Sequence, residues 1–314
     1  MTDYSELIDA ETWAFIERTN AFYPPDAADL PIEGQRAIYD RMCRAFFAGY
    51  PDRVNAETTA LDAGDRQIPL RIYRSDRADH IVTILYLHGG GFTLGGLDSH
   101  DDVCAELCQR TGYEVVSVDY RLAPEHLHPA AYDDVLAAFE HVAASRAGPI
   151  LLMGDSAGGN LAAGVAHATR ARERPPVGQV LIYPGLGGDH GKGSYVTHAQ
   201  APMLTLRDLI FYKDCRTGGA DFSTDPTYAP LADRDFAGLP PTVIVTAECD
   251  PLSSDGETYR DHILAAGGKA AWFEEKGMVH GYLRARHTVT RAARSFTRIV
   301  DATTALGRRE WPYR

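Results

Sequence analysis

The sequence predicts an α/β fold in which helices cover both faces of a mostly parallel β-sheet. Short, continuous apolar runs recur from residue 81 onward, without the alternation typical of a half-exposed sheet. Strands buried on both faces have this pattern. Helical segments lie between most of these runs, and strands that alternate with helices are typical of a right-handed, doubly wound sheet.

The expected elements follow in chain order. Residues 4–48 are predicted to form two amphipathic helices separated by Tyr23-Pro24-Pro25, and residues 54–74 two strands around a turn at 62–65. The expected buried strands are 81–87, 114–118, 150–153, 179–183, 242–246 and 270–275. The expected helices are 101–110, 130–144, 157–170, 255–266 and 287–306.

The segment 185–237 interrupts the alternation of strands and helices. It is rich in Gly and Pro at its ends and has a short helical run near 205–215. A long insertion after a sheet strand is more typical of a lid or cap than of a new domain. We therefore expect one domain over 1–314, although a prior of about 150 residues per domain would suggest two.

Composition excludes several classes of protein. The 314 residues are 45% hydrophobic and 24% charged, which is typical of a globular chain with a large core. A net charge of −12 disfavours binding to nucleic acid or to an anionic membrane surface. The acidic start, residues 1–6, leads into no apolar stretch of a signal peptide, and the odd number of five cysteines suggests reduced thiols. We expect a cytoplasmic protein without a membrane span.

The most informative motif is Gly154-Asp155-Ser156-Ala157-Gly158, between a predicted strand and a predicted helix. This G-x-S-x-G pattern in a strand–turn–helix context is typical of a nucleophile elbow, which holds a serine hydroxyl above the sheet. The alternative is a glycine-rich turn in which Ser156 only caps the helix.

A serine nucleophile needs a base, and the base needs an orienting acid. In this fold the three should occur in the order serine, acid, histidine, each just beyond a strand. Asp250 follows the strand predicted at 242–246, and His280 follows the strand predicted at 270–275. We therefore expect Ser156, Asp250 and His280 to be catalytic.

The third requirement is a set of backbone N–H groups that stabilise an oxyanion. The run His88-Gly89-Gly90-Gly91-Phe92 follows the strand predicted at 81–87, and its glycines allow the backbone to approach a substrate. Together with the N–H of Ala157 it supplies the donors. The run does not fit a nucleotide-binding glycine pattern.

These motifs resemble the hormone-sensitive-lipase-like carboxylesterases of the α/β-hydrolase fold, bacterial branch. The resemblance covers about residues 65–300 and rests on five motifs in order, which are 88–92, 119–125, 154–160, 250–252 and 280–282. It implies a sheet of about eight strands and a helical cap formed by about residues 1–50 and 185–237 over a core formed by about 51–184 and 238–314. Ser156, Asp250 and His280 are its implied triad. Gly90, Gly91 and Ala157 are its implied oxyanion donors.

The resemblance further implies hydrolysis of short- to medium-chain acyl esters through an acyl-enzyme, a small-molecule ester as the partner, and a homodimer as a candidate assembly. It implies no cofactor and no metal. Cys104 and Cys108 are spaced for one helix face, yet further ligands are missing nearby, so packing is the better interpretation.

The sequence departs from the family pattern at two positions and leaves other functions open. The family often has an acidic residue four positions after the triad Asp, where this chain has Ser254 followed by Asp255, so Asp255 is a second candidate acid. Tyr282 stands where Phe is common. The same machinery could serve an amidase or formamidase, or the fold could be a non-catalytic ligand receptor, which the presence of His280 disfavours.

Overall fold

The fold is built on a single twisted sheet, seen in a computed structural model that describes residues 2–76 and 81–313. The eight strands have the spatial order β1-β2-β4-β3-β5-β6-β7-β8. Their bounds are β1 (Val54–Asp62), β2 (Gln67–Ser75), β3 (Thr83–Leu87), β4 (Glu114–Val118), β5 (Ile150–Asp155), β6 (Gly178–Ile182), β7 (Thr242–Cys249) and β8 (Ala270–Val279).

The sheet is parallel except at one edge. The β1 and β2 strands form an antiparallel pair, and β2 pairs antiparallel with β4, whereas every pair from β4 to β8 is parallel. This agrees with the two strands expected around a turn in residues 54–74, followed by buried parallel strands. In β3, β4, β5 and β6 every residue is buried, which explains their largely apolar character.

Helices cover both faces of the sheet. Their bounds are α1 (Tyr4–Leu7), α2 (Ala10–Asn20), α3 (Ile32–Phe46), α4 (Asp101–Thr111), α5 (Ala130–Ser145), α6 (Ala157–Thr169), α7 (Ser194–Thr197), α8 (Leu206–Thr217), α9 (Ser253–Ala265) and α10 (Thr290–Gly307). Short 3₁₀ helices are η1 (Ala27–Asp29), η2 (Leu97–His100), η3 (Pro230–Ala232) and η4 (Tyr282–Ala285).

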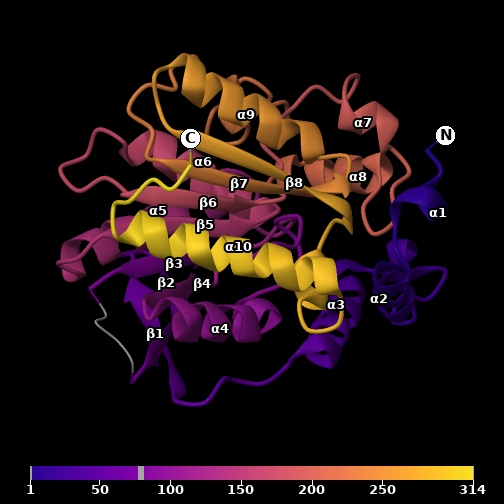
Figure 1. Ribbon diagram of the computed structural model, residues 1–314, viewed down its shortest axis with the longest axis horizontal. Coiled ribbons are helices and arrows are strands. Elements are labelled where there is room, and N and C mark those ends of the chain that lie inside the picture. The colour runs from indigo at the N-terminus through magenta and orange to yellow at the C-terminus, as the bar shows by residue number, and fades with distance from the viewer. Residues whose placement is uncertain (1, 77–80, 314) are drawn as a thin grey trace.

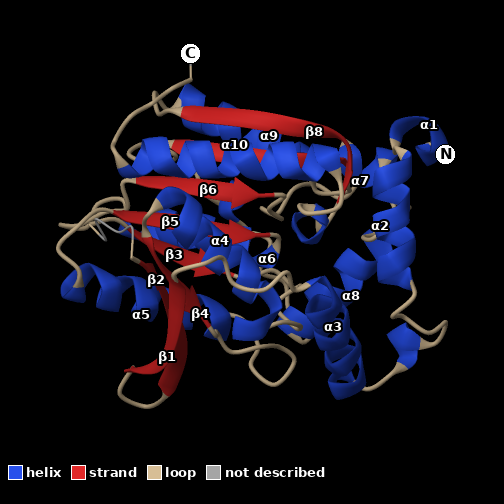
Figure 2. Ribbon diagram, turned by 60° about the horizontal axis from the view of Figure 1, so that its bottom comes forward, coloured by secondary structure: helices blue, strands red, loops and turns tan. Residues whose placement is uncertain are grey.

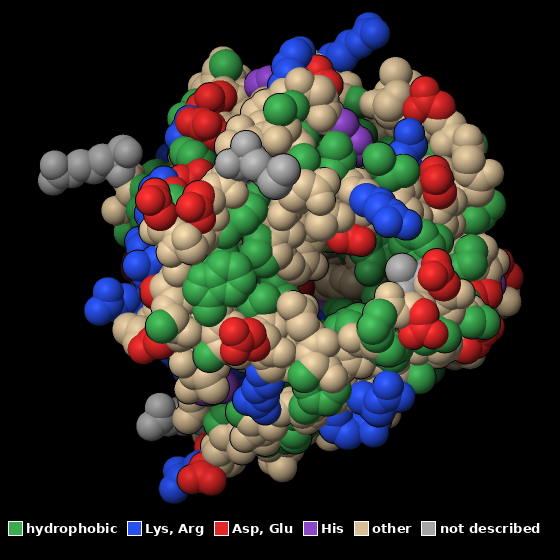
Figure 3. Space-filling model, turned by 90° about the vertical axis from the view of Figure 1, so that its right-hand side faces the viewer, with side chains coloured by type: hydrophobic (Ala, Val, Ile, Leu, Met, Phe, Trp, Pro, Cys, Tyr) green, Lys and Arg blue, Asp and Glu red, His purple; other side chains and the backbone are tan. Residues whose placement is uncertain are grey.

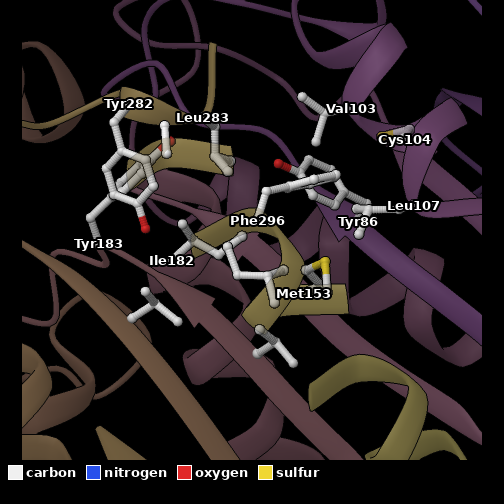
Figure 4. Close-up of a cluster of buried hydrophobic side chains, with 14 of the residues drawn as sticks. Tyr86, Val103, Cys104, Leu107, Met153, Ile182, Tyr183, Tyr282, Leu283 and Phe296 are labelled. Atoms are coloured by element: carbon white, nitrogen blue, oxygen red, sulfur yellow. The ribbon is translucent and has the colours of Figure 1, made fainter. Parts of the chain in front are cut away.

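Two apolar cores lie on opposite faces of the sheet. The α4 and α10 helices pack on one face, where Tyr86, Met153 and Phe296 belong to the same buried cluster (Figures 1 and 4). The α5, α6 and α9 helices contribute to the second cluster. Alternate residues of one strand enter different clusters, as with Ile84 and Leu85, which is the pleat of a strand buried on both sides.

The remaining helices gather at one end of the sheet. Figure 2 shows α1, α2, α3, α7 and α8 together beyond the ends to which the parallel strands point. The first two large helices match the pair expected in residues 4–48, and α8 matches the helical run expected near 205–215. Parallel strands place their carboxyl-end loops at this edge, where ligands bind in open α/β sheets. These helices therefore surround the position of the predicted site.

Candidate active site

Ser156 lies at a sharp turn between β5 and α6. Its backbone has φ 54° and ψ −117°, a region that non-glycine residues rarely adopt, and its N–H donates to the carbonyl of Ile182 at 2.9 Å. A Cβ on Gly154 or on Gly158 would collide with neighbouring backbone atoms. The small residues of the motif are thus required by the tight turn, as the sequence predicted.

The three predicted catalytic side chains meet at the carboxyl end of the sheet. His280 Nε2 lies 2.8 Å from Ser156 Oγ, and His280 Nδ1 lies 2.7 Å from Asp250 Oδ2. Asp250 directly follows β7, and His280 directly follows β8, which continues to Val279 rather than ending near residue 275. The strand ends therefore place these side chains together, although 124 residues separate Ser156 from His280.

Asp250 is well fixed as the partner of His280. Its side chain is fully buried, and its second oxygen accepts the N–H of Leu252 at 2.9 Å. The ring of Tyr183 packs against the imidazole with 4.8 Å between the ring centroids. These contacts hold the imidazole in one orientation, with one nitrogen toward the carboxylate and the other toward the serine.

Asp255, the second candidate acid, has different partners. Its carboxylate accepts the N–H of Leu186 at 2.6 Å, the N–H of Gly188 at 3.3 Å and the hydroxyl of Tyr195 at 3.0 Å. Burial raises the pKa of Asp255 to about 6. Asp255 therefore anchors the segment that follows β6, while Asp250 is the acid beside His280.

The glycine loop after β3 lies beside the serine. Gly90 and Gly91 have positive φ values of 129° and 60°, which glycine adopts readily. Within residues 2–76 and 81–313, the N–H groups of Gly90, Gly91 and Ala157 donate to no protein group. These three residues line the same cavity as Ser156 and His280. Such free donors are what an oxyanion hole requires.

Sequence reasoning missed a buried polar cluster beneath the elbow. The carboxylate of Asp155 accepts the hydroxyl of Tyr86 at 2.8 Å and the N–H of Gly89 at 3.0 Å, and it lies 3.1 Å from His100 Nε2. Burial alone would raise the pKa of Asp155, but His100, Arg284 and Tyr86 together hold it well below its usual range. Asp155 occupies a variable position of the elbow pattern, so no local signal marked it.

A cavity of about 630 Å³ opens above Ser156 and His280. Besides the loops of the sheet, its walls include residues of α2, α3, α7 and α8, among them Thr19, Met42, Tyr195 and Tyr212. Figure 3 looks onto this side of the molecule and shows a hollow bordered by hydrophobic and charged side chains. Its volume lies within the range of small-molecule sites, roughly 300 to 1,000 Å³.

The described residues offer neither a metal site nor a membrane-spanning helix. Among the residues that the structure describes, no group of three or more His, Cys, Asp or Glu side chains could hold a metal ion. Cys104 and Cys108 are free and buried in the apolar core on the α4 face, in agreement with a packing role. No described helix is both long and apolar enough to cross a bilayer.

Known proteins share this architecture. A family model described as "alpha/beta hydrolase fold" matches residues 84–284. The carboxylesterase NlhH of Mycobacterium tuberculosis is 40% identical over 252 residues, which cover 77% of this chain and 79% of the relative. The ethyl acetate hydrolase of Pseudomonas putida is 33% identical over 247 residues, covering 75% and 77%.

Solved structures agree with the sequence relatives. The ester-hydrolase EH1AB1 from the metagenome of Lake Arreo superposes with a TM-score of 0.88 at 30% identity, covering 95% of this chain and 99% of that one. An esterase of Pyrobaculum calidifontis gives a TM-score of 0.84 at 30% identity, with 88% and 94% covered. The chain belongs to the α/β-hydrolase-fold family, among its hormone-sensitive-lipase-like carboxylesterases.

Proposed function

We propose that this carboxylesterase hydrolyses its esters through a covalent acyl-enzyme on Ser156, with His280 as general base and Asp250 as the acid that orients it. The observation that carries the proposal is the continuous hydrogen-bonded chain from Ser156 Oγ through His280 to Asp250, with contacts of 2.8 and 2.7 Å. A serine hydroxyl becomes an effective nucleophile when a neighbouring base removes its proton.

The acylation step follows from this arrangement. His280 Nε2 accepts the hydroxyl proton while Ser156 Oγ attacks the acyl carbon, and Asp250 stabilises the resulting imidazolium. The bond to the leaving oxygen then breaks, and His280 donates the proton to the departing alcohol. Water enters, gives its proton to His280 and releases the acid from Ser156, which regains its proton.

The N–H groups of Gly90, Gly91 and Ala157 would hold the oxyanion that forms in both steps. They have no other hydrogen-bond acceptor in the described part of the chain and line the cavity beside Ser156. Ala157 is the first residue of α6, whose N-terminal dipole also favours negative charge. Each such donor contributes about 3 to 4 kcal/mol to the stabilisation of a transition state.

We further propose short- to medium-chain acyl esters, from acetyl to about hexanoyl, as substrates, with residues 1–50 and 185–237 forming a cap over the core. The name of the Pseudomonas putida relative, ethyl acetate hydrolase, supports a short acyl group. Residues from both segments line the cavity, which supports their role as a cap. A homodimer and the cytoplasmic location stay predictions.

The decisive experiment removes the nucleophile. Wild type should hydrolyse p-nitrophenyl butyrate and, after treatment with an organophosphate, carry the phosphoryl adduct on the peptide that contains Ser156. Ser156→Ala should lose both activity and label while keeping the wild-type circular dichroism. The matched control is Ser145→Ala, which removes an exposed hydroxyl near the end of α5. Full activity in Ser156→Ala, or an adduct elsewhere, would refute the proposal.

A further inference from the structure

Arg284 is a cavity arginine that has no acidic partner among the described residues and whose guanidinium is only partly hydrogen-bonded. Arg284 lies in η4, four residues after His280, and lines the cavity that contains Ser156. Its Nη2 donates to the hydroxyl of Tyr39 at 2.5 Å and to Cys43 Sγ at 3.3 Å. In the described part of the chain no carboxylate forms an ion pair with Arg284, and its buried Nε donates to nothing.

Arg284 is half-buried, and its lack of an ion pair contrasts with a neighbouring arginine. Arg286, two residues further along, donates to Asp102 at 2.7 Å and to Glu106 at 2.8 Å. A charge removed from water is costly unless it is paired. For Arg284 the buried negative charge of Asp155 acts only through space, because the hydrogen bonds of that carboxylate go to Tyr86, Gly89 and His100.

A second arginine of the cavity, Arg216, is buried and its hydrogen bonds are satisfied differently. Both Nη atoms donate to neutral oxygens, the side-chain oxygen of Asn160 at 3.2 Å and the carbonyl of Tyr228 at 3.3 Å. Its guanidinium also stacks 3.6 Å from the ring centre of Phe92. Arg216 therefore has a structural role in the cavity wall, whereas Arg284 keeps N–H groups that donate to no protein acceptor in the described part of the chain.

The free Nη1 of Arg284 lies near Gly281, the residue after His280. Its Nη1 has no acceptor among the described residues and lies 3.7 Å from the position that a Cβ would take on Gly281. Gly281 directly follows His280, and both line the cavity. Arg284 and Ser156 therefore line the same cavity, so a substrate bound at Ser156 can present a polar group to the free Nη1.

We propose that Arg284 binds a carboxylate carried by the ester, so that the preferred substrates are esters with a free carboxylate in the acyl or the alcohol part. A guanidinium is planar and always charged, and its parallel N–H groups match the two oxygens of a carboxylate. The anion would supply the negative partner that the protein does not provide. This inference rests on the proposed function, since it concerns the substrate held at Ser156.

The test uses two matched substrate pairs, in which a methyl ketone replaces the carboxylate at nearly constant size. In the first pair, mono-p-nitrophenyl succinate against p-nitrophenyl levulinate, the charge lies in the acyl part. In the second pair, acetoxyacetate against acetoxyacetone, it lies in the alcohol part. For each pair we measure the ratio of kcat/KM for the carboxylate to kcat/KM for the ketone, which cancels any general loss of activity.

In wild type the ratio should exceed one for at least one pair, despite the net charge of −12, and that pair identifies the side that Arg284 recognises. Arg284→Gln should lower this ratio by ~10-fold or more, because a hydrogen bond to a charged group is lost. Arg284→Lys keeps the positive charge but loses the planar pair of parallel N–H groups, so it should give an intermediate ratio. Lys213→Gln is the matched control, because it removes an exposed cation of the same cavity, and its ratio should change by no more than ~2-fold.

Two outcomes would overturn the inference. The first is a wild-type ratio below one for both pairs, which needs no variant and so holds even if Arg284→Gln fails to fold. The second is an unchanged ratio in folded Arg284→Gln. Either result leaves the serine mechanism intact as long as the ketone esters are hydrolysed and Ser156→Ala is inactive, so the two proposals fail separately.

Discussion

The carboxylate of Asp155 accepts the backbone N–H of Gly89 at 3.0 Å, so the residue before the elbow serine holds the start of the glycine loop. The same carboxylate lies 3.1 Å from His100, whose ring is buried. One buried anion therefore links the two segments that must cooperate, Ser156 on one side and Gly90 and Gly91 on the other.

Asp155→Asn should impair both stability and turnover. The amide removes one of the two carboxylate oxygens that contact Tyr86, Gly89 and His100, and a buried polar group left without its partner costs about 1 to 3 kcal/mol in the free energy of unfolding. We expect kcat to fall by about 10-fold with little change in KM, because the glycine donors move relative to Ser156. Steady-state kinetics and urea unfolding measure the two effects, and Asp189→Asn, an exposed carboxylate, is the control. Unchanged kcat would show that this link does not position the loop.

Asp250→Asn should reduce kcat by about 10⁴-fold, because an amide cannot stabilise the imidazolium and favours the wrong tautomer of His280. Asp255→Asn should keep most of the turnover, since Asp255 binds Leu186, Gly188 and Tyr195 rather than the imidazole. Comparing kcat of the two folded variants on p-nitrophenyl butyrate checks this. Equal losses would contradict the assignment of Asp250 as the orienting acid.

Much of this architecture could be predicted from the sequence, because buried strands and tight turns leave local signals. The apolar runs located β3 to β8, and the glycines around Ser156 indicated its turn. Long-range polar contacts leave no such signal. Nothing near Asp155 indicates that His100 reaches it, and nothing near Arg284 indicates that its neighbours are Tyr39 and Cys43 rather than a carboxylate.

The chain-length preference is expected to favour short acyl groups. With p-nitrophenyl esters from acetyl to palmitoyl, kcat/KM should peak between acetyl and about hexanoyl, because a cavity of about 630 Å³ must hold the p-nitrophenyl group together with the acyl chain. Initial rates below the critical micelle concentration give the profile, and Ser156→Ala provides the blank. A maximum at long chains would contradict the proposed substrate range.

Gly91→Ala should disturb the loop through a specific neighbour on α8. A Cβ on Gly91 would come within 2.5 Å of the ring of Tyr212, and its φ of 60° costs an alanine about 1 kcal/mol. We expect kcat to fall by roughly 10-fold. Adding Tyr212→Ala should recover part of the loss, because the collision involves only a side chain.

Gly90→Ala provides the matched comparison. Its Cβ would collide with the backbone carbonyl of Leu94, which no side-chain substitution can move, so adding Tyr212→Ala should not help. The measurement is kcat of the two single and two double variants. Equal rescue of both glycine variants would show that Tyr212 does not restrict the loop.

Asp255 should make the stability of the protein depend on pH. Burial raises its pKa to about 6, whereas an aspartate in the unfolded chain titrates near 3.9. The folded state therefore binds the proton more tightly, and the free energy of unfolding should fall by about 3 kcal/mol as pH rises from about 4 to about 6, then level off. Asp255→Asn cannot titrate, so urea unfolding between pH 4 and 8 should show wild type losing stability relative to this variant over that interval. Wild-type and variant curves that run parallel across the interval would contradict the raised pKa, and Asp189→Asn, with its exposed carboxylate, should show no such divergence.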